Sequence, residues 1–378
     1  MTLPEQLFAA RNYGKVREPL LEASTLPPHC YTDERFYRRE IERVFCDHWQ
    51  FVGREEQLEG PGSYFCHDRP GGGVIVLRDV GGEVRAYANS CRHRGARLLE
   101  GSGSCKRIVC PYHSWSYGLD GGLVGAPGMQ EVHGFENADY PLLELAAECW
   151  QGFIFIHYRS SPPPLAGHLG NMPAKFAGHD CANMRLVGEL HFDIAANWKL
   201  LAENALEAYH TGSVHRETLG QQQARAIAAS GNWTGLLVED EQSVATLPGE
   251  DNPFPYIDGL DAEALSGAYF TMLFPSTQFV FAQDCMWWLS FAPVAVDRTR
   301  LSIGACFPRS TVARPDFDEK VRPYFDRWRR ATGEDNAICE QQQLGQALTR
   351  PPGRFAASEF AVHAFDNWIL DQVLDGGE

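Results

Sequence analysis

The spacing of hydrophobic and polar positions changes several times along this chain. Residues 32–46 mix charged and apolar side chains at a helical period. Residues 51–90 instead contain short apolar runs cut by paired glycines, as in GGVIVLRDVGGEVRAYAN, a pattern typical of antiparallel strands joined by tight turns. The same pattern continues through WSYGLDGGLVG and WQGFIFIHY. It predicts a small all-β domain at residues 47–160, preceded by a helical segment at residues 1–46.

A proline-rich stretch, RSSPPPLAG at residues 159–167, separates this region from a second domain, because consecutive prolines continue neither a helix nor a central strand. Beyond it, AANWKLLAENALEAYH has a helical pattern, YFTMLFPSTQFVFAQDCMWWLSFAPVAV and RLSIGACF favour strands, and RPDFDEKVRPYFDRWRRAT and EDNAICEQQQLGQAL favour helices. The predicted fold class is α+β, with an antiparallel sheet covered by helices in a helix-grip arrangement at residues 161–378. The segment 1–46 is expected to pack on this second domain.

Length and composition agree with two globular domains. The chain has 378 residues, of which 44% are hydrophobic and 22% charged, as in ordinary folded proteins. A net charge of -16 argues against a nucleic-acid partner. No run approaches the roughly 18 consecutive apolar residues of a membrane span, and the N-terminus lacks the apolar core of a signal peptide. We therefore expect a soluble cytoplasmic protein, whose 11 cysteines stay free or bind metal.

Three cysteines and two histidines fall within CRHRGARLLEGSGSCKRIVCPYH at residues 91–113, a stretch too rich in Gly, Arg and Ser to be a buried core. Cys91 and His93 form one closely spaced pair, and Cys110 and His113 form a second. Two thiolates and two imidazoles suit either a zinc ion or a mixed-ligand iron–sulfur cluster. The Cys-x-His spacing is shorter than in most structural zinc sites. A zinc-stabilised binding protein nevertheless stays an alternative.

A second group of candidate ligands lies in NWKLLAENALEAYHTGSVH. Glu207 and His210 are three residues apart and would share one face of a helix, whereas His215 would lie about 140° beyond His210 on an unbroken helix. We predict that Gly212 lies just past the helix end, takes a positive φ and turns the chain so that His215 approaches His210. Two imidazoles plus one carboxylate form the facial triad of non-haem iron(II) oxygenases.

The cysteine and histidine loops resemble the cluster-binding signature of Rieske proteins in its oxygenase form, the catalytic α subunit of ring-hydroxylating oxygenases. The resemblance is carried by CRHRG at residues 91–95 and CPYHSW at residues 110–115. It implies that the two cysteines hold the buried iron of a [2Fe–2S] cluster and the two histidines the outer iron. Rieske proteins of respiratory complexes carry two more cysteines, where this chain has Ala96 and Tyr112. Cys105 has no assigned partner and is expected to be a bystander.

The resemblance also supplies candidates around a mononuclear iron. It points to Asp335, in EDNAICEQQQLG, as the acidic third ligand. The spacing of Thr332 and Asp335 also fits a helix-capping box, and Asp284 is the substitute ligand. The resemblance implies that Glu207 connects a cluster histidine of one subunit to an iron histidine of the next, as outer carboxylates do for metal-bound imidazoles. Asn204, one helical turn earlier, is expected to face the pocket.

The family resemblance implies the terminal oxygenase component of a two-part system, which activates O2 at a mononuclear Fe(II). An NAD(P)H-dependent flavin reductase, with or without a ferredoxin, would supply electrons, and the chains would form a closed head-to-tail homotrimer. Glu207 and the modest chain length favour the branch that hydroxylates or N-demethylates quaternary amines and betaines. Ring dihydroxylation of arenes to cis-dihydrodiols is the alternative, and a pure Rieske electron carrier is a more remote one.

Aromatic residues concentrate in residues 269–292, where they either form the core of a sheet or line a pocket. In a pocket their faces would bind a quaternary ammonium group by cation–π interaction, or would stack on an aryl ring. The residues are Tyr269, Phe270, Phe274, Phe279, Phe281, Trp287, Trp288 and Phe291.

Overall fold

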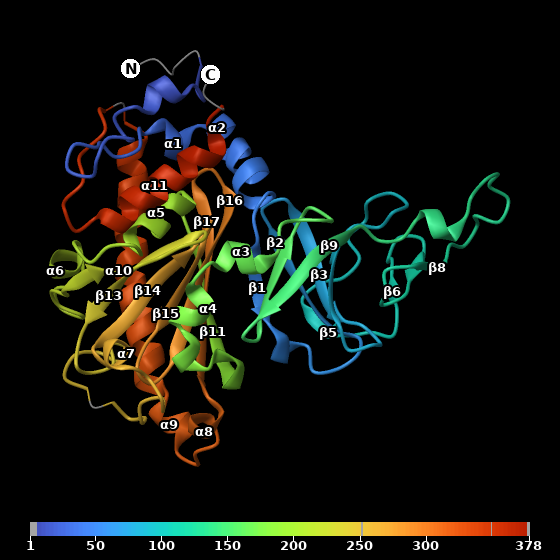
Figure 1. Ribbon diagram of the computed structural model, residues 1–378. Coiled ribbons are helices and arrows are strands. Elements are labelled where there is room, and N and C mark those ends of the chain that lie inside the picture. The colour runs from blue at the N-terminus through green and yellow to red at the C-terminus, as the bar shows by residue number, and fades with distance from the viewer. Residues whose placement is uncertain (1–5, 251, 349, 376–378) are drawn as a thin grey trace. The chain divides into compact units, whose positions relative to one another are not determined.

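The computed structural model describes residues 6–250, 252–348 and 350–375 (Figure 1). Its contacts divide the chain into two compact units, one of residues 45–165 and one of residues 1–44 together with 166–378. The sequence pattern had placed the domain limits at residues 47 and 160. Within the described residues, no helix has both the length and the apolar character that a membrane crossing requires.

The unit of residues 45–165 is built on a seven-stranded antiparallel sheet. Its strands in spatial order are β1 (Gln50–Arg54), β10 (Phe153–His157), β9 (Glu144–Trp150), β4 (Val84–Ala88), β3 (Gly72–Arg78), β2 (Ser63–Arg69) and β5 (Ser102–Ser104). A smaller sheet contains β6 (Ile108–Val109), β7 (Ser116–Tyr117) and β8 (Leu123–Gly125). Short 3-10 turns occupy Glu55–Gln57 and Asn137–Asp139.

Strand β3 lies between β4 and β2 in this sheet, and its central residues are buried on both faces. Because successive side chains of a strand point to opposite faces, Val74 and Val76 join one hydrophobic cluster while Ile75 and Leu77 join another. This arrangement explains why its sequence is a continuous apolar run and not an alternating one. The second cluster also contains both predicted cysteine ligands and Trp115. The core of the unit therefore holds the loops that carry the candidate ligands.

The other unit contains a second seven-stranded antiparallel sheet. In spatial order its strands are β11 (Met184–Ile194), β17 (Arg298–Pro308), β16 (Met286–Ala295), β15 (Thr277–Phe281), β14 (Gly267–Leu273), β13 (Trp233–Glu239) and β12 (Ala224–Ala226). Strands β12 to β17 follow one another as a meander, and β11 is added beside β17. The long apolar run at 269–296 is thus divided among three strands, with a cis peptide bond between Phe274 and Pro275 at the first turn.

Helices cover this sheet (Figure 1). The longer ones are α5 (Trp198–Asn204), α10 (Arg322–Gln346) and α11 (Phe360–Val373). Shorter helices are α1 (His29–Thr32), α2 (Glu34–Glu40), α3 (Leu165–Leu169), α4 (Met172–Lys175), α6 (Thr211–Val214), α7 (Ala262–Leu265), α8 (Arg309–Val312) and α9 (Phe317–Lys320), with 3-10 turns at Ala10–Tyr13, Ala177–His179 and Cys181–Asn183. Helix α5 contacts β16, α10 contacts α5 and β11, and α11 contacts α5 and β13. This architecture confirms the predicted α+β class.

The N-terminal segment belongs to the helical layer of this unit. The side chain of Asp33 accepts a hydrogen bond from the backbone N–H of Arg35 and so caps α2. The helical pattern at residues 32–46 continues beyond α2 as a π-helical turn, Ile41–Phe45. Arg17 forms a salt bridge of 2.7 Å with Asp371 of α11, which fastens the segment to the helices.

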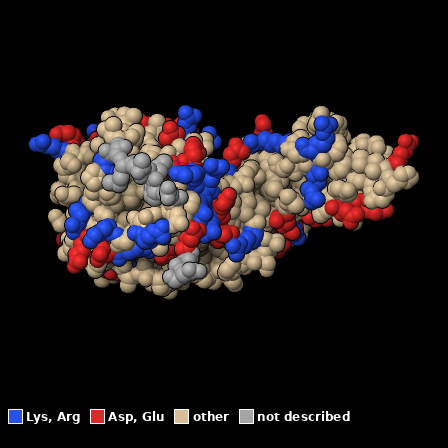
Figure 2. Space-filling model, turned by 90° about the horizontal axis from the view of Figure 1, so that it is seen from above, with Lys and Arg blue, Asp and Glu red and all other residues tan. Residues whose placement is uncertain are grey.

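Acidic and basic side chains are interspersed over the face of the molecule shown in Figure 2. This face does not present the concentrated row of Lys and Arg on which nucleic-acid backbones bind.

Candidate metal centres

Two loops of similar construction carry the predicted cluster ligands. In the first, the backbone N–H of Gly95 donates to the carbonyl of Cys91, and Cys91 N–H donates to Ala96 O. In the second, Ser114 N–H donates to the carbonyl of Cys110, and Cys110 N–H donates to Trp115 O. The fourth residue after each cysteine is left-handed, with φ of 75° at Gly95 and 60° at Ser114. Each loop therefore turns its histidine back beside its cysteine.

The four side chains divide into a buried pair and an exposed pair. Cys91 is 3% exposed and Cys110 is 2% exposed, whereas His93 and His113 are exposed, with ring centroids 4.9 Å apart. The hydroxyl of Tyr117 lies 3.2 Å from Cys91 Sγ. An asymmetric [2Fe–2S] cluster fits this set, because its thiolate-bound iron would lie inside and its imidazole-bound iron at the surface. The histidines would then exchange electrons with a partner.

Cys105 lies apart from these loops and is half-buried against the same hydrophobic cluster. Burial raises the pKa of its thiol, which disfavours the thiolate that redox chemistry and metal binding require. Cys105 is in no disulfide. The expectation that Cys105 is a bystander agrees with this environment.

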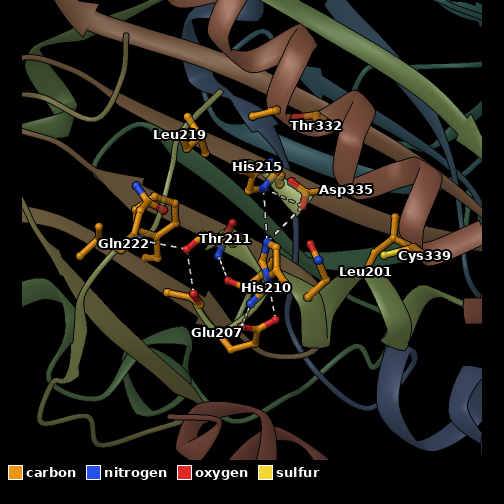
Figure 3. Close-up of a pocket in the computed structure, with 18 of the residues that line it drawn as sticks. Leu201, Glu207, His210, Thr211, His215, Leu219, Gln222, Thr332, Asp335 and Cys339 are labelled. Carbon is orange, nitrogen blue, oxygen red and sulfur yellow. Dashed lines mark hydrogen bonds and ion pairs between the residues drawn. The ribbon is translucent and has the colours of Figure 1, made fainter. Parts of the chain in front are cut away.

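The three predicted ligands of the mononuclear iron site, His210, His215 and Asp335, lie together in the unit that contains residues 166–378 (Figure 3). His210 Nε2 is 3.3 Å from His215 Nε2 and 3.3 Å from Asp335 Oδ1, and His215 Nε2 is 3.0 Å from Asp335 Oδ1. An octahedral ion with ligands about 2.1 Å away places neighbouring donors about 3.0 Å apart. The buried Asp335 Oδ1 accepts no hydrogen bond from the described residues. The donor set and its spacing therefore fit one face of an octahedral metal ion.

The outer nitrogens of both imidazoles are held by carboxylates. His210 Nδ1 lies 2.6 Å from Glu207 Oε1, and His215 Nδ1 lies 2.7 Å from Glu334 Oε2. Each Nδ1–H can donate to its carboxylate, which directs the Nε2 lone pair toward the centre of the triad. Glu334 also accepts a hydrogen bond of 2.6 Å from Thr218. Both histidines are thus fixed in the orientation that metal binding needs.

The electrostatics of the triad favour a bound cation. Burial alone would lower the pKa of His210, but the carboxylates of Asp335 and Glu207 outweigh it and raise that pKa to about 9. Burial alone would raise the pKa of Asp335, but the two imidazoles lower it to about 2. The site therefore attracts positive charge, and a metal ion would compete with the protons that these groups otherwise hold.

The chain reaches this geometry by a different route from the one predicted. Helix α5 ends at Asn204, so Glu207 and His210 do not share a helical face. Instead the Glu207 carboxylate accepts hydrogen bonds from the backbone N–H groups of Tyr209 and His210 and closes a turn before α6. The prediction for Gly212 was wrong, because it lies inside α6 and is absent from the positive-φ residues.

The structure places the remaining candidate residues in different surroundings. Asp335 lies in the middle of α10, far from its first turn, so the capping-box interpretation of Thr332 is wrong. Asp284 is buried elsewhere, where Ser243 and Tyr324 donate to its two carboxylate oxygens. Asn204, at the end of α5, lines the pocket beside the triad, as predicted.

The pocket beside the triad is walled by the sheet on one side and by α5 and α10 on the other. Alternate residues of β16, from Trp287 to Phe291, face it, as does Phe270 of β14. The other aromatic residues of the 269–292 segment are absent from this lining. Phe279, Phe281 and Trp288 are buried at 2% exposure or less. The segment therefore serves both as sheet core and as pocket wall.

Two residues of α10 at this site were not found from the sequence. Glu334 directly precedes Asp335 in the sequence. That position beside a predicted ligand is the only sequence signal that could have pointed to Glu334. Arg327 lines the pocket about two helical turns before Asp335. In the sequence it looks like any charged residue on the solvent face of a helix.

Family models match both units of the chain. A Rieske [2Fe-2S] domain matches residues 48–136, and the catalytic domain of the ring hydroxylating alpha subunit matches residues 181–375, more than half of the chain. The chain therefore belongs to the family of ring-hydroxylating oxygenase α subunits, as the sequence motifs predicted. A Rieske [2Fe–2S] cluster and a mononuclear iron are the cofactors of these two domains.

Individual relatives refine the comparison. The chain is 33% identical to the glycine betaine monooxygenase oxygenase subunit of Chromohalobacter salexigens, over 93% of this chain and 86% of that protein. It is 31% identical to the carnitine monooxygenase oxygenase subunit of Escherichia coli, over 62% of this chain but only 64% of that protein. The naphthalene 1,2-dioxygenase structure from Rhodococcus sp. bound to indole shares the fold, with a TM-score of 0.81, 20% identity and 99% coverage of both chains. The fold is thus common to relatives named for different substrates.

Proposed function

We propose that the protein is the terminal oxygenase component of a Rieske system that hydroxylates an N-methyl group of a small ammonium substrate and so removes it. The triangle of His210, His215 and Asp335 donor atoms, with edges of 3.0–3.3 Å, is the observation that carries this proposal. The similarity to the glycine betaine and carnitine monooxygenase subunits supports an ammonium substrate. Bound at the triad, iron(II) would supply reductive activation of O2.

The chain's own residues prepare the substrate and the electron path. Cys91, His93, Cys110 and His113 are proposed to hold the [2Fe–2S] cluster. The carboxylates of Glu207 and Glu334 fix the two imidazoles, and the apolar and aromatic side chains of the pocket exclude water and orient the substrate. Insertion of one oxygen atom into a C–H bond of the N-methyl group gives a carbinolamine, N–CH2OH, whose C–N bond then breaks to release formaldehyde and the lower amine. The second oxygen atom leaves as water, with two electrons drawn from NAD(P)H.

The electrons are proposed to come from a separate flavin reductase and to cross between chains of a head-to-tail homotrimer. Glu207 and His210 support this route, because they line both the substrate pocket and a second cavity bordered by Tyr31, Gln342 and Glu359. An approaching Rieske domain could reach the imidazole through Glu207 from that second cavity. Light scattering should then report a particle of three chains of 42.2 kDa each, and a monomer would contradict the ring.

Product analysis tests the function itself. Purified protein supplied with a reductase, NAD(P)H and O2 should release formaldehyde from methylated amines or betaines in a panel that also contains arenes. The variant H210A should lose the mononuclear iron and all product while its cluster spectrum stays intact. H191A is the matched control, because His191 is an exposed histidine of β11 whose Nδ1 lies 3.0 Å from Ser302 Oγ. Formation of cis-dihydrodiols from the arenes alone, or product from H210A, would overturn the proposal.

A further inference from the structure

Arg327 is a buried cation that has no acidic partner in the described part of the chain. It is the one Lys or Arg among the described residues that line the pocket, and it is 6% exposed. Its Nε finds no hydrogen-bond acceptor there, and no salt bridge reaches its guanidinium. An unpaired buried charge is costly and calls for a partner. Because the guanidinium borders a substrate pocket, the missing partner can be a ligand.

The surroundings of Arg327 do not supply that partner. The guanidinium carbon lies over the ring of Trp287, 5.4 Å from its centroid. Stacking of this kind uses the face of the guanidinium and leaves the N–H donors at its edge free for a carboxylate. Asp335 attracts Arg327 electrostatically but forms no salt bridge with it. The Asp335 Oδ1 atom faces the two imidazoles instead. Burial lowers the pKa of Arg327 to about 10, so the side chain is still charged at neutral pH.

The position of Arg327 suits one end of a small substrate. Arg327, Ala331 and Asp335 recur at intervals of four residues along α10, and all three line the pocket, as residues on one helical face do. Eight residues of α-helix span about 12 Å. The face therefore carries the metal-binding acid at one end and the guanidinium at the other. A molecule lying along it would present one end to the metal and the other to Arg327.

The charges of the pocket distinguish between kinds of ammonium substrate. Phe270 and Phe291 offer aromatic faces to a methylated ammonium group. A simple cation would meet the repulsion of Arg327, whereas a zwitterion pairs its carboxylate with the guanidinium and places its ammonium group against the aromatic faces. On the basis of the proposed function, we propose that Arg327 binds a substrate carboxylate and thereby selects N-methylated ammonium carboxylates over ammonium alcohols and esters.

The first test compares ligands on the wild-type protein and needs no turnover. Calorimetry under anaerobic conditions would measure the binding of glycine betaine, 4-(trimethylammonio)butanoate and the methyl ester of each. Loss of one partner from a buried charge pair weakens binding by roughly 30-fold or more. We therefore expect the better carboxylate to bind at least about 30-fold more tightly than its ester. Esters that bind as tightly as the carboxylates would overturn the proposal, whether or not any variant folds.

The second test uses R327Q with R329Q as its matched control. Arg329 lies two residues along the same helix, with a 55% exposed side chain that pairs with Asp326. R327Q should abolish the preference for carboxylates by raising the KM for the carboxylate, whereas the KM for the ester should stay unchanged or fall because the repulsion of Arg327 is removed. R329Q should behave as wild type. An equal loss for carboxylate and ester in R327Q, with cluster and iron content intact, would show a structural role and overturn the proposal.

These outcomes separate the inference from the proposed function. If the carboxylates bind through Arg327 but no formaldehyde forms from any of them, the binding role stands and the proposed reaction fails. If methylated amines are demethylated without any preference for a carboxylate, the reaction stands and the role of Arg327 fails.

Discussion

Each imidazole of the triad uses both of its ring nitrogens. The Nε2 atoms of His210 and His215 point at Asp335, and the Nδ1 atoms face Glu207 and Glu334. A carboxylate behind a metal-bound histidine fixes the ring and increases the basicity of the nitrogen that faces the metal. The outer acids therefore belong to the proposed metal site as much as the three inner donors do.

Replacing Glu334 should weaken the mononuclear site without touching the cluster. E334Q keeps the size of the side chain but removes the charge behind His215, so we expect about 10-fold to 100-fold weaker iron binding. Titration of the iron-depleted protein with Fe(II) under anaerobic conditions would measure it. D326N, which changes an exposed acid of the same helix, should bind iron as wild type does. An unchanged affinity in E334Q would remove Glu334 from the site.

Sequence motifs predicted the inner donors better than the residues that support them. His210 and His215 are five positions apart, and Asp335 was placed by the family motif, so local patterns sufficed. Glu334 contacts His215 across 119 positions of the chain, and no local pattern encodes such a contact. Arg327 was not predicted as a site residue for the same reason, because its burial depends on the sheet that packs against α10.

At the level of elements, turns rather than long helices build the mononuclear site. Helix α5 stops at Asn204, and side-chain capping by Glu207 starts the turn that presents His210. A periodic pattern could not reveal this break, because the residues after Asn204 continue to fit a helix. Strands β14 to β17 were predicted, because apolar runs of β-branched and aromatic residues are strong signals. Strands β11, β12 and β13 were not predicted, and the two helical segments expected at residues 314–332 and 334–348 are joined in the single helix α10.

A buried acidic pair between α5 and α11 should make stability depend on pH. Burial raises the pKa of Glu203 to about 7 and raises the pKa of Asp366 well above its ordinary value. The folded protein thus holds protons that the unfolded chain releases, so the free energy of unfolding should fall as the pH rises from about 4.5 through about 7. D366N removes one acid at nearly constant volume. It should be more stable than wild type by about 1–2 kcal/mol at pH 8, with no gain near pH 4.

Urea unfolding at a series of pH values would measure this difference. The control is D371N, because Asp371 lies on the same helix with a 61% exposed side chain and should show no such pH dependence. A D366N protein that is less stable than wild type at pH 8 would mean that the Asp366 carboxylate is stabilising in its charged form.

At the scale of the whole molecule, the residues of each proposed metal site lie within one compact unit. The cysteine and histidine loops close on the core of residues 45–165, and the triad closes between α6 and α10 of the other unit. The sequence placed the domain limits at residues 47 and 160, and the contacts divide the chain at residues 45 and 165. The proline-rich stretch and the change from period 2 to period 3.6 are local signals of such a limit. A chain with one electron-transfer site and one oxygen-activating site is what a Rieske oxygenase component requires.

The most direct test of this account is a single turnover without a reductase. Protein reduced chemically and freed of reductant would be mixed with O2 and an N-methylated ammonium carboxylate, while the cluster spectrum and formaldehyde are followed. Wild type should form formaldehyde as its cluster is reoxidised. D335N, with its cluster intact, should form none and should keep the cluster reduced over the same period. Formaldehyde from D335N at the wild-type rate would contradict the assignment of the triad as the site of oxygen activation.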